Sequence, residues 1–260
     1  MKHLMTTDEN EIGRLIGSSA YQNNSHPDHK ATHQKITDWF AFHYGRQPAQ
    51  TDATGRTIAP SARKASFFIS QIQLGKTLFV GEGNLSFALS IEKMPGITSS
   101  KITATTYEKT SDLSEEAQQN SEILKQSGAS VLNGIDATKL EQYFPHLKFD
   151  TIVFQFPNAG SREPEYGRNP NYILIRNFLK SAASCLAPNG RILITAVDNP
   201  HYHGAFQFEE ASEKTGYSIL GSYPFDPESF PGYSHINTND DDSALEKHNE
   251  FKTWIFELKK

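Results

Sequence analysis

The sequence has a single cysteine, Cys185, so no disulfide bond can form within the chain. It has no apolar run close to the roughly 18 residues that a transmembrane helix needs, and its first residues, MKHLMTTDENEIG, lack the apolar region of a signal peptide. Free thiols persist in reducing compartments. We therefore expect a cytoplasmic protein that does not enter a membrane.

The sequence also lacks the short motifs of several enzyme classes. It contains no G-x-S-x-G nucleophile motif, no phosphate-binding P-loop and no C-x-x-C pair. Four histidines near its start, His26, His29, His33 and His43, have neither cysteine partners nor regular spacing, so we expect no metal site there.

Charge is distributed unevenly along the 260 residues, whose formal net charge is −5. Residues 1–76 contain nine Lys or Arg and six Asp or Glu, which leaves residues 77–260 with a net charge of −8. Such an acidic core argues against a protein that coats nucleic acid through a general basic surface. We divide the chain into an N-terminal extension, residues 1–73, which we expect to be partly helical and which could cap a substrate, and a main domain, residues 74–260.

The main domain is organised around one stretch, TLFVGEGNLSFALSI, residues 77–91. Its apolar start suits a strand buried on both faces, Gly81 and Gly83 permit backbone conformations closed to other residues, and Asn84 can cap a following helix. Unpaired N–H groups of such a helix point outward at the carboxyl end of the strand, where nucleotide-like ligands bind in open α/β sheets. Because Ser86 replaces the third glycine of the dinucleotide fingerprint, a plain strand-to-helix turn remains an alternative.

Strands and helices alternate after this turn. Apolar alternation predicts further strands in KITATTYEKT, SVLNGI, FDTIVFQFPNAG and RILITAVDN, and helices over 111–126, 171–187 and 204–215. Cys185 falls in the apolar pattern of the second of these helices, where a buried thiol is expected. The segments YSILGSYPF and FKTWIFELKK predict an antiparallel pair at the end. This order predicts an α/β fold with a doubly wound, mostly parallel sheet.

Polar residues follow three of these predicted strands. Glu108 comes about 25 residues after the glycine turn, where a carboxylate can accept hydrogen bonds from ribose hydroxyls. Asp136 could bind an adenine amine or cap the next helix. Gln155, Phe156 and Pro157 could form a slot that stacks a planar ring and binds its edge, or they could form a plain turn.

A loop rich in Gly and Pro, AGSREPEYGRNP, follows this edge. It is long enough to cover the edge. Its two arginines, Arg162 and Arg168, could meet phosphates or be solvated.

Six segments in this order resemble the family of yeast ribosomal RNA (uridine-N3)-methyltransferase, the BMT5-like domain: GEGNLSFALS, TTYEKT, NGIDATKL, FDTIVFQFPNAG, LKSAASCLAPNGRILIT and FPGYSH. The resemblance covers about residues 74–260. It implies a Rossmann-like class I methyltransferase core, S-adenosylmethionine as methyl donor and a ribosomal uridine as acceptor. The residues expected to bind the cofactor are Gly81, Glu82, Gly83, Asn84, Ser86, Glu108, Asp136, Ala137, Gln155, Phe156 and Pro157.

Methyl transfer needs alignment of the sulfonium methyl with an acceptor lone pair in a dry pocket. Uridine N3 carries a proton that must leave, so a base or a hydrogen-bonding group would help. Asn158 and His235 are the catalytic candidates. Asn158 cannot take a proton at neutral pH, so His235 is the candidate base, with a structural or substrate-binding role left open. Arg162, Arg168 and Tyr233 are the candidates for substrate binding.

Two other functions remain open. A small-molecule methyltransferase on the same fold is favoured by the acidity of the core, and by Gln155 and Asn158, which stand where the family more often has Asn and His. A non-catalytic binding module is the other alternative, against which the intact Gly81, Gly83, Glu108 and Asp136 argue.

Overall fold

The computed structural model describes residues 14–15, 18–22, 26–28, 31–32, 35, 67–72, 74–161, 163–235, 248 and 250–259. The chain divides into two compact units, Met1–Arg63 and Lys64–Lys260. The described part of the first unit includes the short helix α2, Ser19–Gln22. The boundary of the N-terminal extension at residue 73 stays a prediction.

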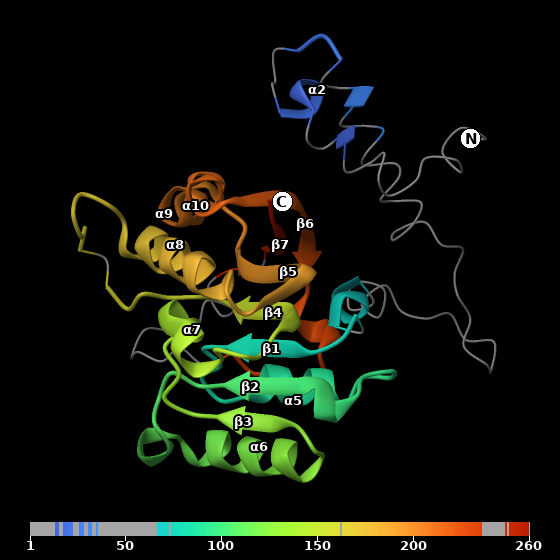
Figure 1. The fold of residues 1–260 in the computed structure, drawn as a ribbon, viewed down its shortest axis with the longest axis vertical. Helices are drawn as coiled ribbons and strands as arrows, with labels where there is room; N and C mark the ends of the chain where they lie inside the picture. Colours follow the sequence, from blue (N-terminus) through green and yellow to red (C-terminus); the bar gives the residue numbers. More distant parts are fainter. Residues whose placement is uncertain are drawn as a thin grey trace, which may run out of the picture. The chain divides into compact units, whose positions relative to one another are not determined.

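The second unit is built on a seven-stranded sheet with the strand order β3-β2-β1-β4-β5-β7-β6 (Figure 1). The first five strands are parallel, and β7 is antiparallel to both of its neighbours. The strands are β1 Thr77–Val80, β2 Ile102–Thr105, β3 Ser130–Leu132, β4 Phe149–Gln155, β5 Leu186–Val197, β6 Tyr217–Phe225 and β7 Phe251–Leu258.

Helices connect the strands and pack on both faces of the sheet. Successive residues of a strand point to opposite faces, so Leu78 and Val80 belong to one apolar cluster and Phe79 to another. The first cluster includes residues of α7, α8 and α10, and the second includes residues of α5, α6 and Phe68. The α-helices are α5 Ser86–Glu92, α6 Glu115–Gln126, α7 Leu140–Tyr143, α8 Pro170–Ala182, α9 Pro200–Phe206 and α10 Phe208–Thr215, and the 3-10 helices are η2 Ser99–Lys101, η3 Thr110–Asp112, η4 Ala137–Lys139 and η5 Pro227–Ser229.

The structure confirms the predicted strand, turn and helix over residues 77–91 and the antiparallel pairing of the last two strands. It also confirms the doubly wound sheet. No described helix is long and apolar enough to cross a membrane.

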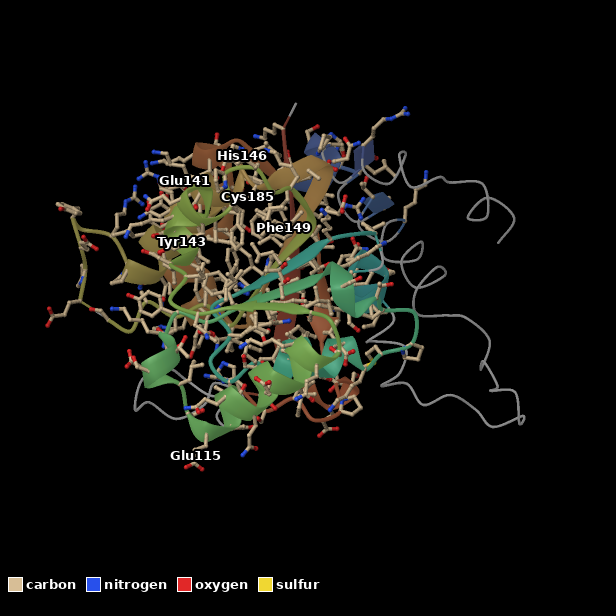
Figure 2. All side chains as sticks on the ribbon, turned by 60° about the horizontal axis from the view of Figure 1, so that its bottom comes forward. Glu115, Glu141, Tyr143, His146, Phe149 and Cys185 are labelled. Carbon is tan, nitrogen blue, oxygen red and sulfur yellow. The ribbon has the colours of Figure 1, made fainter. Side chains whose placement is uncertain are left out.

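Three predicted helix boundaries are wrong. The helix predicted to run to residue 187 ends at Ala182, because the chain turns there and the carbonyl of Cys185 accepts the N–H of Phe149 on β4. Cys185 is fully buried beside Phe149 (Figure 2), in this turn rather than in the helix. The helix predicted over 204–215 is two helices, since Gln207 has a φ of 47° and breaks it. The helix predicted from residue 111 begins at Glu115, after a cap by Ser114.

Candidate active site

The turn between β1 and α5 satisfies its own N–H groups. The Asn84 side chain accepts a hydrogen bond from the Ser86 N–H (3.1 Å), and Glu82 Oε2 accepts one from the Ala88 N–H (3.0 Å). The expectation that these first-turn N–H groups point outward to a ligand is therefore wrong at these two positions. Asn84 does bind the start of the helix, as predicted, although the residue at the N-cap is Leu85.

Backbone strain in this turn lies at an unexpected residue. Gly81 has a φ of 64°, as predicted, and a Cβ atom there would lie 2.7 Å from the Phe154 ring. Gly83 does not have a positive φ, and the other left-handed residue is the fully buried Leu85, with a φ of 63°. A bulky residue in this conformation is strained, and such strain persists only where the surroundings enforce it.

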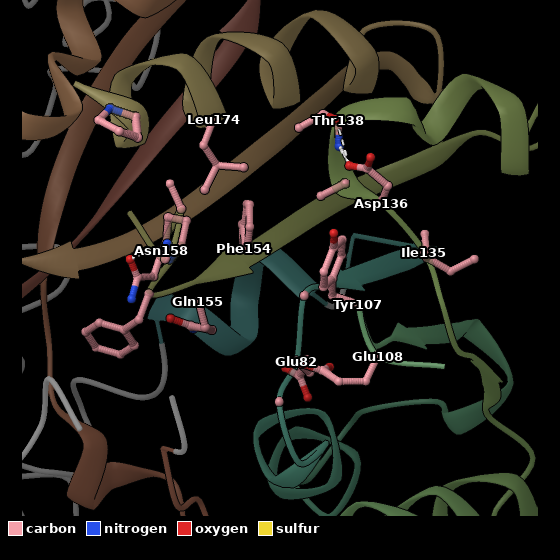
Figure 3. A pocket seen from close by; sticks show the side chains of 18 of the residues that line it. Glu82, Tyr107, Glu108, Ile135, Asp136, Thr138, Phe154, Gln155, Asn158 and Leu174 are labelled. Atoms are coloured by element: carbon pink, nitrogen blue, oxygen red, sulfur yellow. Dashed lines mark hydrogen bonds between the residues drawn. The ribbon is translucent and has the colours of Figure 1, made fainter. Parts of the chain in front are cut away.

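A cavity of about 1220 Å³ opens at the carboxyl ends of β1, β2 and β4 (Figure 3). Parallel strands place their carboxyl ends at one edge of the sheet, which is where this fold type binds ligands. The cavity is lined by most of the predicted site residues, namely Gly81, Glu82, Gly83, Asn84, Glu108, Asp136, Ala137, Gln155, Phe156, Pro157, Asn158, Tyr233 and His235.

Four cavity-lining side chains contain buried polar atoms that have no hydrogen-bond partner within the described part of the chain. These atoms are Glu82 Oε1, Glu108 Oε2, both amide atoms of Gln155, and the hydroxyl of Tyr233. A buried polar atom without a partner costs free energy, so such atoms are rare in folded proteins. Because these atoms lie in residues around one cavity, we interpret the cavity as a binding site in which a ligand provides the missing hydrogen-bond partners.

Burial shifts the pKa of three groups at this site. It raises the pKa of Glu82 to about 7, with only the Ala88 hydrogen bond opposing it. Burial, reinforced by the Glu82 charge, raises the pKa of Tyr233 well above its usual range. Burial also lowers the pKa of His235 to about 4, so its imidazole is neutral at pH 7.

The two acidic residues that follow β2 and β3 are held differently. The Glu108 carbonyl accepts hydrogen bonds from the Gly134 N–H (2.7 Å) and the Thr106 hydroxyl (2.8 Å), while its carboxylate faces the cavity. Asp136 caps η4 through Thr138 and forms an ion pair with Lys139 (2.8 Å). Burial would raise the pKa of Asp136, but the hydrogen bonds from Lys139 and Thr138 lower it.

The end of β4 forms the opposite wall of the cavity. Phe156 has a φ of 46° and is 9% exposed, and its N–H donates to the Thr195 carbonyl (2.8 Å). Its ring meets that of His235 edge to face, with 4.9 Å between the centroids. Asn158 is exposed at the rim, where its side chain accepts the Gly160 N–H (3.0 Å). Whether these residues stack an acceptor stays a prediction.

Two predicted site residues lie elsewhere. Ser86 is 2% exposed and does not line the cavity, because its hydroxyl bonds to the backbone of Ser234. Arg168 does not line the cavity: its side chain is 42% exposed, and its guanidinium forms two hydrogen bonds with Glu210 (2.9 and 3.0 Å), which also pairs with Lys214. Arg162 lies outside the described residues.

Some cavity residues were not predicted. Tyr107, 66% exposed, and Tyr143, 40% exposed, both line the cavity, as does Ser234. Tyr107 is next to Glu108 in the sequence, and an aromatic residue beside a candidate ligand-binding acid was a usable signal. Nothing local in the sequence marks Tyr143, which the fold brings to the cavity from α7.

The strand order, with a cavity at the carboxyl edge of the parallel strands, is that of a Rossmann-like methyltransferase fold of class I. The family described as rRNA (uridine-N3-)-methyltransferase BTM5-like matches residues 78–237, which is more than half of the chain. The chain therefore belongs to the BMT5-like family.

Sequence identity to individual relatives is low. A human protein named ferredoxin-fold anticodon-binding domain-containing protein 1 is 28% identical over 184 residues, 65% of this chain, but the match spans only 29% of the human protein. The 25S rRNA (uridine(2634)-N(3))-methyltransferase of Saccharomyces cerevisiae is 23% identical over 240 residues, covering 69% of this chain and 71% of that protein. The crystal structure of the N-methyltransferase NodS from Bradyrhizobium japonicum WM9 superposes with a TM-score of 0.48 and 13% identity, covering 77% of this chain and 98% of that one.

Proposed function

We propose that this chain transfers a methyl group from S-adenosylmethionine to a ring nitrogen of a nucleobase in RNA, with N3 of a ribosomal uridine as the first candidate. Family membership supports the reaction, and the name of the yeast relative supports the acceptor. The observation that carries the proposal is the group of unpaired, buried polar atoms around one cavity at the carboxyl edge of the sheet.

The residues present fit this cofactor. Glu108 Oε2 is an acceptor without a donor among the described residues, which suits the hydroxyls of a ribose, and Asp136 also lines the cavity, where it could bind the base. Gly81 lets the backbone of the turn pack against the Phe154 ring at the edge of the cavity, since a Cβ there would lie 2.7 Å from that ring. When bound, S-adenosylmethionine supplies an electrophilic methyl group on sulfur. The cofactor would lie along Gly81–Asn84, Glu108 and Asp136.

The acceptor nitrogen must lose its proton as it gains the methyl group. His235 suits this step poorly, because a pKa of about 4 makes its imidazole a weak base. Glu82 suits it better: it lines the cavity, its pKa of about 7 matches the working pH, and its Oε1 has no partner among the described residues. We assign proton acceptance to Glu82, and to His235 the packing of the acceptor beside Phe156. Asn158 at the rim can donate hydrogen bonds to an acceptor carbonyl.

The acidic lining of the cavity favours the second candidate, a small-molecule acceptor. Acidic residues outnumber the two lysines there, Lys109 and Lys139, and repel a polyanion. The acidic residues of the lining are Glu82, Glu108, Asp112, Asp136, Glu163 and Glu165.

Labelled S-adenosylmethionine separates the two candidates. We expect wild-type protein to label RNA from a total RNA pool and not a pool of small metabolites, with the label in 3-methyluridine after digestion. Glu82→Gln, which keeps the shape but cannot accept the proton, is the inactive control. RNA labelling should fall as salt rises, because phosphate contacts release counterions. Salt-insensitive labelling of a metabolite would overturn the RNA acceptor and leave the second candidate.

A cytoplasmic location is part of this proposal. It rests on Cys185, the single cysteine of the sequence, which lies buried and reduced in the core. Staining of tagged protein in intact cells would test it, and a signal confined to another compartment would overturn it.

A further inference from the structure

Ser234 is fixed to the start of α5 by hydrogen bonds between residues that are far apart in the sequence. The Ser86 hydroxyl donates to the Ser234 carbonyl (2.7 Å) and accepts from the Ser234 N–H (3.1 Å). The two residues are 148 positions apart in the sequence, so this pairing is a product of the tertiary fold.

Asn84 completes the attachment. Its Nδ2 donates to the Ser234 carbonyl (3.1 Å) and to the Ser234 hydroxyl (2.9 Å), while its Oδ1 accepts the Ser86 N–H. The Ser234 hydroxyl in turn donates to Glu116 Oε1 on α6 (3.2 Å). We call these three residues, Asn84, Ser86 and Ser234, the Ser234 clasp. The clasp joins the turn between β1 and α5, which is the cofactor side, to the loop that contains Tyr233 and His235.

The neighbours of Ser234 are the cavity residues Tyr233 and His235. The Tyr233 ring packs edge to face on Phe87 of α5 (4.9 Å between centroids), and the His235 ring packs likewise on Phe156 at the end of β4 (4.9 Å). Because Ser234 lies between Tyr233 and His235 in the sequence, the clasp helps to position the Tyr233 phenol and the His235 imidazole at the cavity.

Another serine on the same helix shows that burial alone does not produce such bonds. Ser90 is one turn further along α5 and, like Ser86, is 2% exposed, but its hydroxyl has no partner among the described residues. Ser86 does not line the cavity, so any effect it has on the reaction must act through Ser234.

We propose that Ser86 is a positioning residue, which with Asn84 holds Ser234 so that Tyr233 and His235 face the methyl acceptor. This role rests on the methyl transfer proposed above. In this proposal the cofactor-side turn and the acceptor-side loop hold each other in position, although they are 148 positions apart in the sequence.

Hydrogen exchange of the intact protein tests the clasp without any substrate. Ser86→Ala removes the acceptor of the Ser234 N–H, so the peptide containing Ser234 should exchange about tenfold faster, as expected for the loss of one or two hydrogen bonds. Ser90→Ala removes a hydroxyl of the same burial from the same helix and should leave that peptide unchanged. Unchanged exchange in Ser86→Ala would overturn the clasp.

Kinetics test the positioning role. We expect Ser86→Ala to lower kcat about tenfold or more while the Kd of S-adenosylmethionine stays within about twofold, because the acceptor side is misplaced and the cofactor side is not. Ser234→Ala keeps both backbone bonds to Ser86 and should have a smaller effect, and Ser90→Ala should have none.

Three results would contradict the role in distinguishable ways. Faster exchange with unchanged kcat would make the clasp purely structural. Weaker cofactor binding with unchanged kcat would place Ser86 in the cofactor site instead. If wild-type protein methylates neither RNA nor metabolites, the proposed function fails and the positioning role fails with it.

Discussion

The carboxyl edge of the parallel strands and the antiparallel half of the same sheet treat buried polar groups differently. At the edge, the Gln155 amide and Glu82 Oε1 have no hydrogen-bond partner among the residues that the structure describes. One strand further on, the buried hydroxyls of Thr195 and Thr253 bind each other at 2.8 Å between β5 and β7. The Tyr217 hydroxyl and Arg191 Nε, which have no partner in the described part of the chain, are exceptions in the antiparallel half.

Gln155 and Thr195 lie on neighbouring strands but differ in whether their side chains have hydrogen-bond partners among the described residues. Gln155 and Thr195 are partners in the register of β4 and β5, so the same sheet geometry serves both. A pair such as Thr195 and Thr253 is complete within the chain and contributes to stability. Unpaired groups at the edge cost stability in the free protein, which is consistent with a site kept for a ligand.

The largest effect should come from Gly81→Ala. Its Cβ would meet the Phe154 ring at 2.7 Å, and its φ of 64° disfavours any side chain. We expect a stability loss on the order of 3 kcal/mol and loss of cofactor binding, measured by urea unfolding and calorimetry. Gly128→Ala is the matched control, with a φ of 100° and open space around the new Cβ. It should lose less stability and keep cofactor binding, and equal losses would contradict the packing argument.

Glu82→Gln should change how stability depends on pH. The folded pKa of Glu82 is raised from 4.5 to about 7, so between these values the unfolded chain has lost a proton that the folded chain keeps. The wild-type free energy of unfolding should therefore fall as pH rises through this window, by about 3 kcal/mol relative to the variant, and stay level above it. Urea unfolding from pH 4 to pH 8 measures the difference. Parallel profiles for the two proteins would show that Glu82 is not buried as described.

A pair of smaller substitutions should have opposite signs. Gln155→Leu removes an unpaired buried amide and should stabilise the free protein by about 1 to 2 kcal/mol, while methyl transfer falls. Thr195→Val leaves the Thr253 hydroxyl without a partner and should destabilise it by about 1 to 2 kcal/mol, and the double variant with Thr253→Val should recover most of this loss. Destabilisation by Gln155→Leu would show that the amide already has a partner.

The sequence was sufficient where the signal is local. The apolar run before Gly81 and the helical spacing after it specify β1 and α5, and Glu108 stands just after a strand, so most cavity residues could be named from the chain alone. The strain at Leu85 could not be foreseen, because a left-handed leucine is imposed by its surroundings. The place of β7 between β5 and β6 is also non-local.

Partners distant in the sequence escaped prediction for the same reason. Arg168 looks like a free cation in its loop, and only the fold brings Glu210 to it. Likewise, the sequence shows Ser86 only as a replacement for the third glycine of the dinucleotide fingerprint. Its hydrogen bonds to Ser234 become visible only in the fold. Pairing of side chains over long sequence separations is set by the sheet order, and composition and periodicity do not contain it.

The claim that the unpaired edge groups serve a ligand is tested most directly by ligand-linked stability. We would measure urea unfolding of wild-type protein and Glu108→Ala, each without and with S-adenosylhomocysteine at about 100 times its wild-type Kd. The ligand should stabilise the wild type by about 2.7 kcal/mol. Glu108→Ala should be about as stable as the wild type without ligand, and should gain about 1 to 2 kcal/mol less with it, because one or two hydrogen bonds are lost. An equal gain in both proteins would contradict the account.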